Sequence, residues 1–439
     1  MNASLVIEPR WLTPDHGSDP ICHTSAHLYV RVNGHLATKV FNDWTRTVEE
    51  SVPLSAYPLA LWLVSSWWRL HWESLSEQRS DVGWRLAHEM RGAGHGFLWP
   101  PLRFEPDGAM VTVRCTPPDL DVPEPIRYLN RFVTSMPVAG FTEGIATFIQ
   151  TVIDRLEDSG IRETPLRMLW REVTGERVDP ETAAYRRMEA LLGWESDEAP
   201  DDVMDDFQGL SLEAGPEAVI EVAAACAGMR PGELLKGIRR GTADTSGVPV
   251  RLSELFKLRD ELSGMPGAAD PPWKRGWDWA QASHRRLGLD SRPVTSGCLT
   301  QIMEFTEREL NGKEAPMAGA PLGLAIKGEG EQRSRLFFRS KSCTERRFEV
   351  ARWMGDALMA PSGDRWLPAT DAKTARQKMQ RAFAAEFLVP IEALKEFLGG
   401  ALADEERIEE AGEHFSVSPL TIRSHLANHR LVPWPDNYL

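Results

Sequence analysis

"RRFEVARWMGDALM", residues 346–359, decides how the C-terminal third of this chain is interpreted. Five of its residues recur at the i, i+3, i+4, i+7 spacing of one helical face: Phe348, Ala351, Arg352, Gly355 and Met359. This pattern predicts a helix with one face in a core. Arg352 lies on that face, and a buried guanidinium needs a carboxylate partner. Asp356 lies one turn further along the same face, so we predict an Arg352–Asp356 ion pair.

The segments around this helix predict a small α+β domain over residues 290–400. "PLGLAIKGEGEQRSRLFFRS" (321–340) predicts two short strands on either side of a glycine-containing turn. Helical periodicity follows at 345–360, 371–387 and 390–399. The remaining segment, 401–439, contains a compact helical pair over 405–434.

Residues 1–130 predict a mixed α/β domain whose role the sequence does not indicate. "HLYVRVNGHLATKVF" (27–41) alternates around Asn33-Gly34, the strongest short signal for a β-hairpin. "LRFEPDGAMVTVRC" (102–115) repeats this pattern around Pro106-Asp107-Gly108. Between the two hairpins, residues 57–75 and 82–92 have the pattern of helices.

Tryptophan is concentrated in this first domain. Six of the 16 tryptophans fall between residues 62 and 99: Trp62, Trp67, Trp68, Trp72, Trp84 and Trp99. Such a cluster can stack on bases or form a cage around a ligand. The four-residue step from Trp68 to Trp72 follows a helical face, which favours burial in a core.

The middle of the chain, residues 131–289, is mainly helical. Amphipathic segments such as "GIATFIQTVIDRLEDSG" (144–160) end at glycine, a common helix stop. The acidic run "ESDEAPDDVMDD" (195–206) lies between two of these segments. We interpret it as a solvated linker, because a mimic of nucleic-acid phosphates needs greater length and interleaved aromatic residues.

Composition places the chain among soluble multidomain proteins. Its 439 residues exceed one ordinary core, and the net charge of −14 argues against nonspecific coating of nucleic acid. The five cysteines form no CxxC pair, which favours reduced thiols in a cytoplasm. We expect no signal peptide, and the most apolar stretch, 58–68, is too short to span a bilayer. The expected location is cytoplasmic, with no membrane partner.

Three motifs in the last 150 residues, in this order, resemble those of the ImmA/IrrE-type metallopeptidases. "RFEVARWMGD" (347–356) resembles the family's R-F-x-x-A-H-E-x-G-H helix at its scaffold positions. "QKMQRAFAAEFLVP" (377–390) is similar to the second helix, E-x-x-A-N-x-F-A-A-x-L-L-x-P. "HFSVSPLTIRSHL" (414–426) is similar to the helix-turn-helix-like tail with F-x-V-S. The resemblance implies a zincin-like α+β domain at 290–400 and a helix-turn-helix-like tail at 401–439.

The positions that would bind zinc in that family carry other residues here. Arg352 and Asp356 replace the two histidines, and Trp353 replaces the glutamate. The acidic third ligand falls at Gln377 or, one register over, near Met379. A single-helix zinc protease needs two imidazoles and a general base, so we expect no catalytic residues, metal or cofactor. We predict that the Arg352–Asp356 ion pair occupies the former metal cavity, with Gln377 as a hydrogen-bond partner. The alternative is that these residues form ordinary core and surface.

The tail has the spacing of a helix-turn-helix. Ile408, Ala411, Phe415, Val417, Ile422 and Leu426 are its expected core. The second helix would present Thr421, Arg423, Ser424 and His425 to base edges, with His429 and Arg430 near phosphate. The first helix is strongly acidic, which would repel the phosphate backbone.

Two functions are compatible with these patterns. The first is a non-enzymatic regulatory or scaffold protein whose pseudo-peptidase domain binds a protein partner; the resemblance suggests a mobile-element or phage-defence system. The alternative is a DNA-binding transcription regulator that uses the C-terminal helix pair. A third, weaker option is a hydrolase site around His88, Glu89 and His95.

Overall fold

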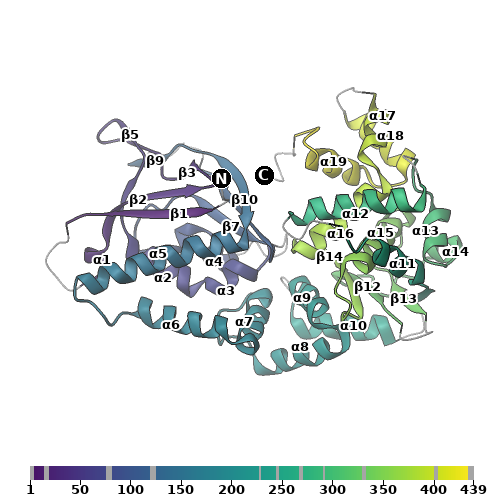
Figure 1. Cartoon of the computed structure of the whole chain (residues 1–439), viewed down its shortest axis with the longest axis horizontal. Coiled ribbons are helices and arrows are strands. Elements are labelled where there is room, and N and C mark those ends of the chain that lie inside the picture. Colours follow the sequence, from purple (N-terminus) through teal and green to yellow (C-terminus); the bar gives the residue numbers. More distant parts are fainter. Residues whose placement is uncertain are drawn as a thin grey trace. The chain divides into compact units, whose positions relative to one another are not determined.

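The computed structural model describes residues 4–13, 19–75, 82–118, 125–226, 229–243, 247–265, 270–289, 292–328, 333–399 and 404–433. The chain forms two compact units, Met1–Met204 (unit 1) and Asp205–Leu439 (unit 2). Both contain helices and antiparallel strands, which confirms a multidomain α+β protein (Figure 1). The range predicted as a helical middle domain, 131–289, is divided between the two units.

The described residues of unit 1 form three small antiparallel sheets. One consists of β1 (Leu5–Trp11), β2 (Ser25–Val32), β3 (His35–Leu36) and β6 (Val52–Ser55). A second consists of β4 (Val40–Asn42), β5 (Thr47–Glu49) and β9 (Ile126–Tyr128). The third consists of β7 (Leu102–Pro106), β8 (Met110–Cys115) and β10 (Phe132–Pro137).

Both predicted hairpins of unit 1 are confirmed. The β2–β3 turn places Asn33 at φ 49° and Gly34 at φ 83°, the left-handed conformation that these two residue types tolerate best. The β7–β8 turn places Gly108 at φ 92°. There, the carboxylate of Asp107 accepts hydrogen bonds from the backbone N–H groups of Ala109 and Met110.

The helices of unit 1 complete a single core with these sheets. They are α1 (Pro20–His23), α2 (Ala56–Ser65), α3 (Trp67–Trp72), α4 (Val82–His88), α5 (Val138–Asp158), α6 (Pro165–Val178) and α7 (Pro180–Leu192), with a 3₁₀ turn at Met90–Ala93. Helix α5 packs on β1 and α2 (Figure 1). Five of the six clustered tryptophans are buried and Trp72 is partly buried, which confirms that the cluster is core.

The acidic run forms the predicted linker only in its first half, because residues 195–200 connect α7 to α8 (Asp201–Ala214) outside any helix or strand. Residues 201–206 are the first part of α8. Asp201 and Asp202 occupy its first turn, where carboxylates interact favourably with the positive end of the helix dipole. The negative charge of this run therefore stabilises a helix start.

The core of unit 2 is built on one antiparallel sheet in the order β11-β13-β12-β14. Its strands are β11 (Val248–Val250), β12 (Leu322–Ile326), β13 (Ser334–Phe337) and β14 (Trp366–Thr370). Strands β12 and β13 are the predicted pair, and their connection at 329–332 lies outside the described residues. The outer strands, β11 and β14, carry no alternating pattern and the sequence did not predict them.

Helices surround this sheet. They are α9 (Pro216–Ala225), α10 (Pro231–Ala243), α11 (Ser253–Glu261), α12 (Pro272–Leu287), α13 (Ser296–Ile302), α14 (Glu307–Leu310), α15 (Cys343–Met359), α16 (Ala375–Leu388), α17 (Ile391–Leu398), α18 (Glu405–Phe415) and α19 (Pro419–Asn428). Helix α16 packs between α12 and α15 and also contacts α19 (Figure 1). No helix in the described part of the chain has the length and apolar character needed to cross a bilayer.

Candidate functional site

Helix α15 contains the decisive sequence stretch, and it is buried on nearly all sides. Its residues from Arg346 to Leu358 are buried except for Phe348, so the helix is not amphipathic in the way its spacing suggested. Gly355 allows α16 to approach closely, because a Cβ atom there would lie 2.7 Å from the ring of Phe383. A helix buried this completely must find a partner for each of its charged side chains.

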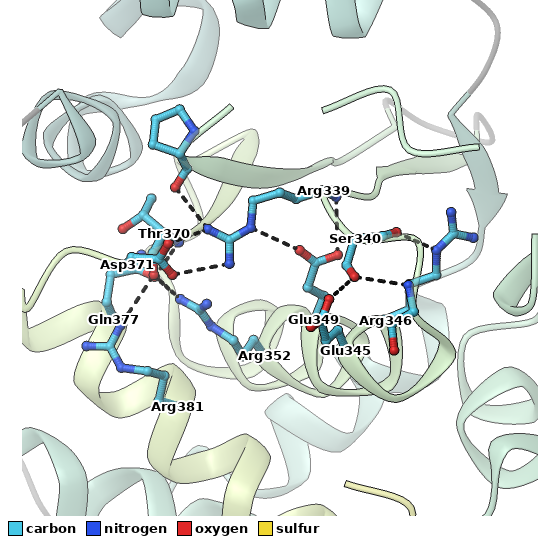
Figure 2. Close-up of polar contacts among 12 residues, drawn as sticks. Arg339, Ser340, Glu345, Arg346, Glu349, Arg352, Thr370, Asp371, Gln377 and Arg381 are labelled. Carbon is cyan, nitrogen blue, oxygen red and sulfur yellow. Dashed lines mark hydrogen bonds and ion pairs between the residues drawn. The ribbon is translucent and has the colours of Figure 1, made fainter. Parts of the chain in front are cut away.

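Arg352 is 3% exposed and reaches two acceptors outside its own helix. Its Nη2 atom donates to the backbone oxygen of Thr370 at 2.6 Å and to the side-chain oxygen of Gln377 (Figure 2). Burial, together with the nearby guanidinium groups of Arg381 and Arg339, lowers the pKa of Arg352 to about 9. The predicted contact with Gln377 is therefore present, and the arginine side chain is held mainly by neutral oxygens.

Asp356 is fully buried, but its partner differs from our prediction. Both of its oxygens accept from Arg376 at 2.8 Å, in a bidentate pair. Arg376 also donates to the buried carboxylate of Asp364 at 2.6 Å. The predicted Arg352–Asp356 ion pair is wrong, because an arginine at the start of α16 fits both oxygens of the carboxylate.

Trp353 and Gln377 are both part of the unit 2 interior. Trp353 has no exposed surface, and its ring packs against Phe338 with a centroid separation of 5.3 Å. Gln377 accepts from the backbone N–H of Thr370 at 2.9 Å and donates to the backbone oxygen of Pro368 at 2.9 Å. All four predicted former metal positions are therefore buried in unit 2.

Three guanidinium groups gather at the end of β14, and we call Arg339, Arg352 and Arg381 the arginine cluster (Figure 2). Arg339 binds the carboxylate of Asp371 at 2.6 Å and 3.2 Å. Arg381 donates to the backbone oxygen of Thr370 at 3.3 Å. The side chain of Asp371 is 74% exposed, whereas that of Arg339 is 27% exposed, so this edge of unit 2 meets solvent. Arg339 also lies close to a buried carboxylate, because its Nε atom is 3.6 Å from Oε1 of Glu349 (Figure 2).

The C-terminal helix pair forms as predicted, with all six expected core residues buried. The predicted DNA-facing residues lie in different environments. Thr421 and Ser424 are partly buried, Arg423 forms an ion pair with Glu405 of α18, and Arg430 is exposed just beyond α19. His425 is 1% exposed, so α19 does not present its ring to solvent.

One polar cluster was missed by the sequence analysis. His425 and His429 of α19 meet Glu386 of α16, and among the described residues this is the one group of potential metal ligands with mutually close ligand atoms. The i,i+4 histidine pair was visible in "HLANH" (425–429). This pair lacks the glutamate of an HExxH motif, and the third member, Glu386, comes from a different helix.

The weaker hydrolase option around His88 is not brought together as a site. His88 has no exposed surface and contacts the backbone oxygens of Trp84 and Arg69 at 2.9 Å and 3.1 Å. His95 is exposed and contacts the backbone oxygen of Ala93. Comparisons of this chain with protein-family models, with curated proteins and with solved structures find no match.

Proposed function

We propose that this chain is a non-enzymatic regulatory or scaffold protein, in which a pseudo-metallopeptidase domain of unit 2 binds a protein partner. The observation that carries the proposal is the environment of Arg352. Its buried guanidinium is held by Thr370 and Gln377 at the position where the resembled peptidases have their first zinc-binding histidine. A fixed cation at this point opposes the binding of a metal cation.

The neighbouring positions support the same interpretation. Both oxygens of Asp356 are engaged by Arg376, so neither is left for a metal. Trp353, at the general-base position, is an apolar core residue. Hydrolysis by the resembled mechanism needs an imidazole pair and a carboxylate base at these positions, and none of these groups is present.

The arginine cluster supports an acidic segment as the feature of the partner that is recognised. Arg339 lies at the solvent-facing edge, and Arg381 and Arg352 add positive charge behind it. Guanidinium groups bind carboxylates in a bidentate manner, as Arg339 already does with Asp371. An acidic segment of the partner would compete with Asp371 for Arg339. The link to a mobile-element or phage-defence system rests on the sequence resemblance alone.

Affinity capture from the source cells tests partner binding. The wild-type chain is compared with Arg339→Gln and with a control, Arg335→Gln, which removes an exposed arginine from β13 of the same unit. We expect a partner that is retained by wild type and control, lost from Arg339→Gln, and released by salt. Equal capture by all three proteins, at equal thermal stability, would contradict the proposed surface.

A separate assay tests the absence of peptidase activity. The purified chain, supplied with zinc, is incubated with an unfolded protein substrate, and fragments are followed by mass spectrometry. We expect no cleavage, because the four positions at which the resembled peptidases act are buried. Cleavage that disappears in an Asp356→Asn variant would refute the non-enzymatic assignment.

A further inference from the structure

A second polar cluster lies where α19 packs on α16, apart from the positions discussed above. His425 and His429 are four residues apart, so both rings project from the same face of α19. Glu386 faces them from α16. The side chains of His425 and Glu386 are 1% and 2% exposed, and that of His429 is 16% exposed. The cluster is thus nearly closed, with solvent access on the His429 side.

The distances among the three side chains match those between ligands of one metal ion. The Nε2 atom of His425 lies 3.1 Å from Oε2 of Glu386, and the Nε2 atom of His429 lies 3.7 Å from the same oxygen. One ligand atom of each residue lies within 4.8 Å of the others. Tetrahedral zinc, with bonds of about 2.0–2.1 Å, holds adjacent ligand atoms about 3.4 Å apart. Small side-chain movements would bring all three atoms onto one ion.

These atoms also lack other partners. In the described part of the chain, the Nε2 atoms of His425 and His429 and the Oε2 atom of Glu386 make no hydrogen bond of good geometry, although both Nε2 atoms lie within ion-pair distance of that oxygen. Buried polar atoms are almost always paired, so three that point at one another call for a shared partner. A divalent cation would satisfy all three, and the glutamate would balance part of its charge.

Helix α12 (Pro272–Leu287) orients two of the three side chains, Glu386 and His429, from outside the cluster. Gln281 donates to Oε1 of Glu386 at 3.0 Å, which leaves Oε2 directed at the histidines. The ring of Trp277 stacks on His429 with a centroid separation of 3.8 Å and an interplanar angle of 18°. Supports of this kind orient metal ligands and exclude water from them. The Nδ1 atom of His425 has no hydrogen-bond partner among the described residues, so His425 lacks the supporting hydrogen bond that Glu386 receives from Gln281.

We propose that Glu386, His425 and His429 bind one zinc ion, which fastens α19 to α16. Two imidazoles and one carboxylate suit zinc, whereas calcium and magnesium prefer oxygen ligands throughout. The position next to the first histidine, where HExxH peptidases have their glutamate, is Leu426, which is 1% exposed. The ion therefore has no adjacent general base, and its role is structural. This inference does not depend on the proposed partner-binding function.

The rival explanation is an ion pair between a protonated histidine and Glu386. Such a pair needs no metal, and it weakens when the histidine loses its proton. Metal binding has the opposite dependence on pH, because zinc requires neutral imidazoles. Cobalt binding to the metal-free chain at pH 6 and at pH 8 therefore separates the two explanations.

The test uses the full chain without an affinity tag, stripped with a chelator and titrated with cobalt as a spectroscopic substitute for zinc. Visible absorption and bound metal are measured for wild type, for His429→Ala and for His414→Ala. His414 is an exposed histidine of α18 and serves as the matched control. We expect about one cobalt ion per chain in wild type and control, tighter binding at pH 8 than at pH 6, and loss of binding in His429→Ala.

Two further measurements keep the proposal falsifiable. A Gln281→Ala variant retains every proposed ligand, and we expect it to bind cobalt about 10-fold to 100-fold more weakly than wild type. Zinc should raise the melting temperature of wild type and leave that of a folded His429→Ala variant unchanged. Folded wild-type protein that binds no cobalt at pH 8, or His429→Ala that binds as much as wild type, overturns the proposal.

Discussion

Two arginine substitutions, Arg352→Met and Arg376→Met, should have opposite effects on the stability of unit 2. Both replace a buried arginine with an unbranched apolar side chain, so the change in shape is matched. Arg352 is held mainly by neutral oxygens, whereas Arg376 neutralises Asp356 and Asp364. The pair of variants therefore compares a buried cation that lacks a directly bonded carboxylate with one that has two.

For Arg352→Met we expect the free energy of unfolding to stay level or to rise by up to about 3 kcal/mol. The lowering of the arginine pKa from 12.5 to about 9 means that the charged form is disfavoured in the fold by about 5 kcal/mol. The substitution loses two charged hydrogen bonds, each worth about 1.5–3 kcal/mol. Both acceptors keep another donor, because Arg381 donates to Thr370 and the Thr370 N–H donates to Gln377.

For Arg376→Met we expect a loss of about 3–5 kcal/mol. Asp356 and Asp364 are 0% and 1% exposed, so the substitution leaves two buried carboxylates without their shared cation. The opposing charges of the two acids raise the pKa of Arg376 despite its burial. That direction indicates that the charged arginine is favoured in the folded state.

The free energy of unfolding of each variant is measured in urea, with hydrogen exchange of the α15 amides as the probe. These amides belong to unit 2, so they report on the unfolding of that unit. The expected result is an unchanged or higher midpoint for Arg352→Met and a much lower one for Arg376→Met. The pairing predicted from sequence gives the reverse order, since Arg352 would then neutralise Asp356. A loss of 3 kcal/mol or more for Arg352→Met, with less than about 1 kcal/mol for Arg376→Met, would refute the assignment of partners.

Three other substitutions have defined outcomes. Gly355→Ala places a Cβ atom 2.7 Å from the ring of Phe383 and should cost about 1–3 kcal/mol in urea unfolding, a loss that Phe383→Leu should reduce. Arg423 is paired with Glu405 in the acidic helix pair, so we expect no gel shift of genomic fragments at low salt. A shift that disappears in Arg423→Ala would instead support DNA binding. Burial lowers the pKa of His71 to about 4, so the unfolded chain takes up a proton between pH 6.5 and 4 that the folded chain does not. The unfolding free energy of unit 1 should therefore fall by about 3 kcal/mol over this range, and His71→Gln should reduce that fall.

Local sequence signals predicted the elements of this fold well. Asn33-Gly34 and Asp107-Gly108 predicted two hairpins, because these residue types favour the backbone conformations that such turns require. The helical segments from 345 to 434 also lie close to their predicted ranges. The acidic run shows the limit of local signals: residues 195–200 form the predicted linker, whereas Asp201 and Asp202 begin α8, where their charge favours a helix.

Contacts between elements could not be predicted in the same way. Asp356 was expected to pair with Arg352 four residues earlier, since only neighbours along a helix are visible in a sequence. Its partner, Arg376, is twenty residues later, on a helix whose position depends on how α16 packs. The histidine pair at 425 and 429 was visible, but Glu386 becomes its neighbour only through the packing of α19 on α16.

The double carboxylate bridge of Arg376 has a consequence for the kinetics of folding. The bridge joins α15, the segment before β14 and the start of α16, so Arg376 reaches both buried carboxylates only when all three segments are in place. Desolvation of the three groups is therefore expected late, after the elements have already assembled. Changes at Arg376 should then act on the rate of unfolding far more than on the rate of folding, so the bridge prolongs the lifetime of the folded unit.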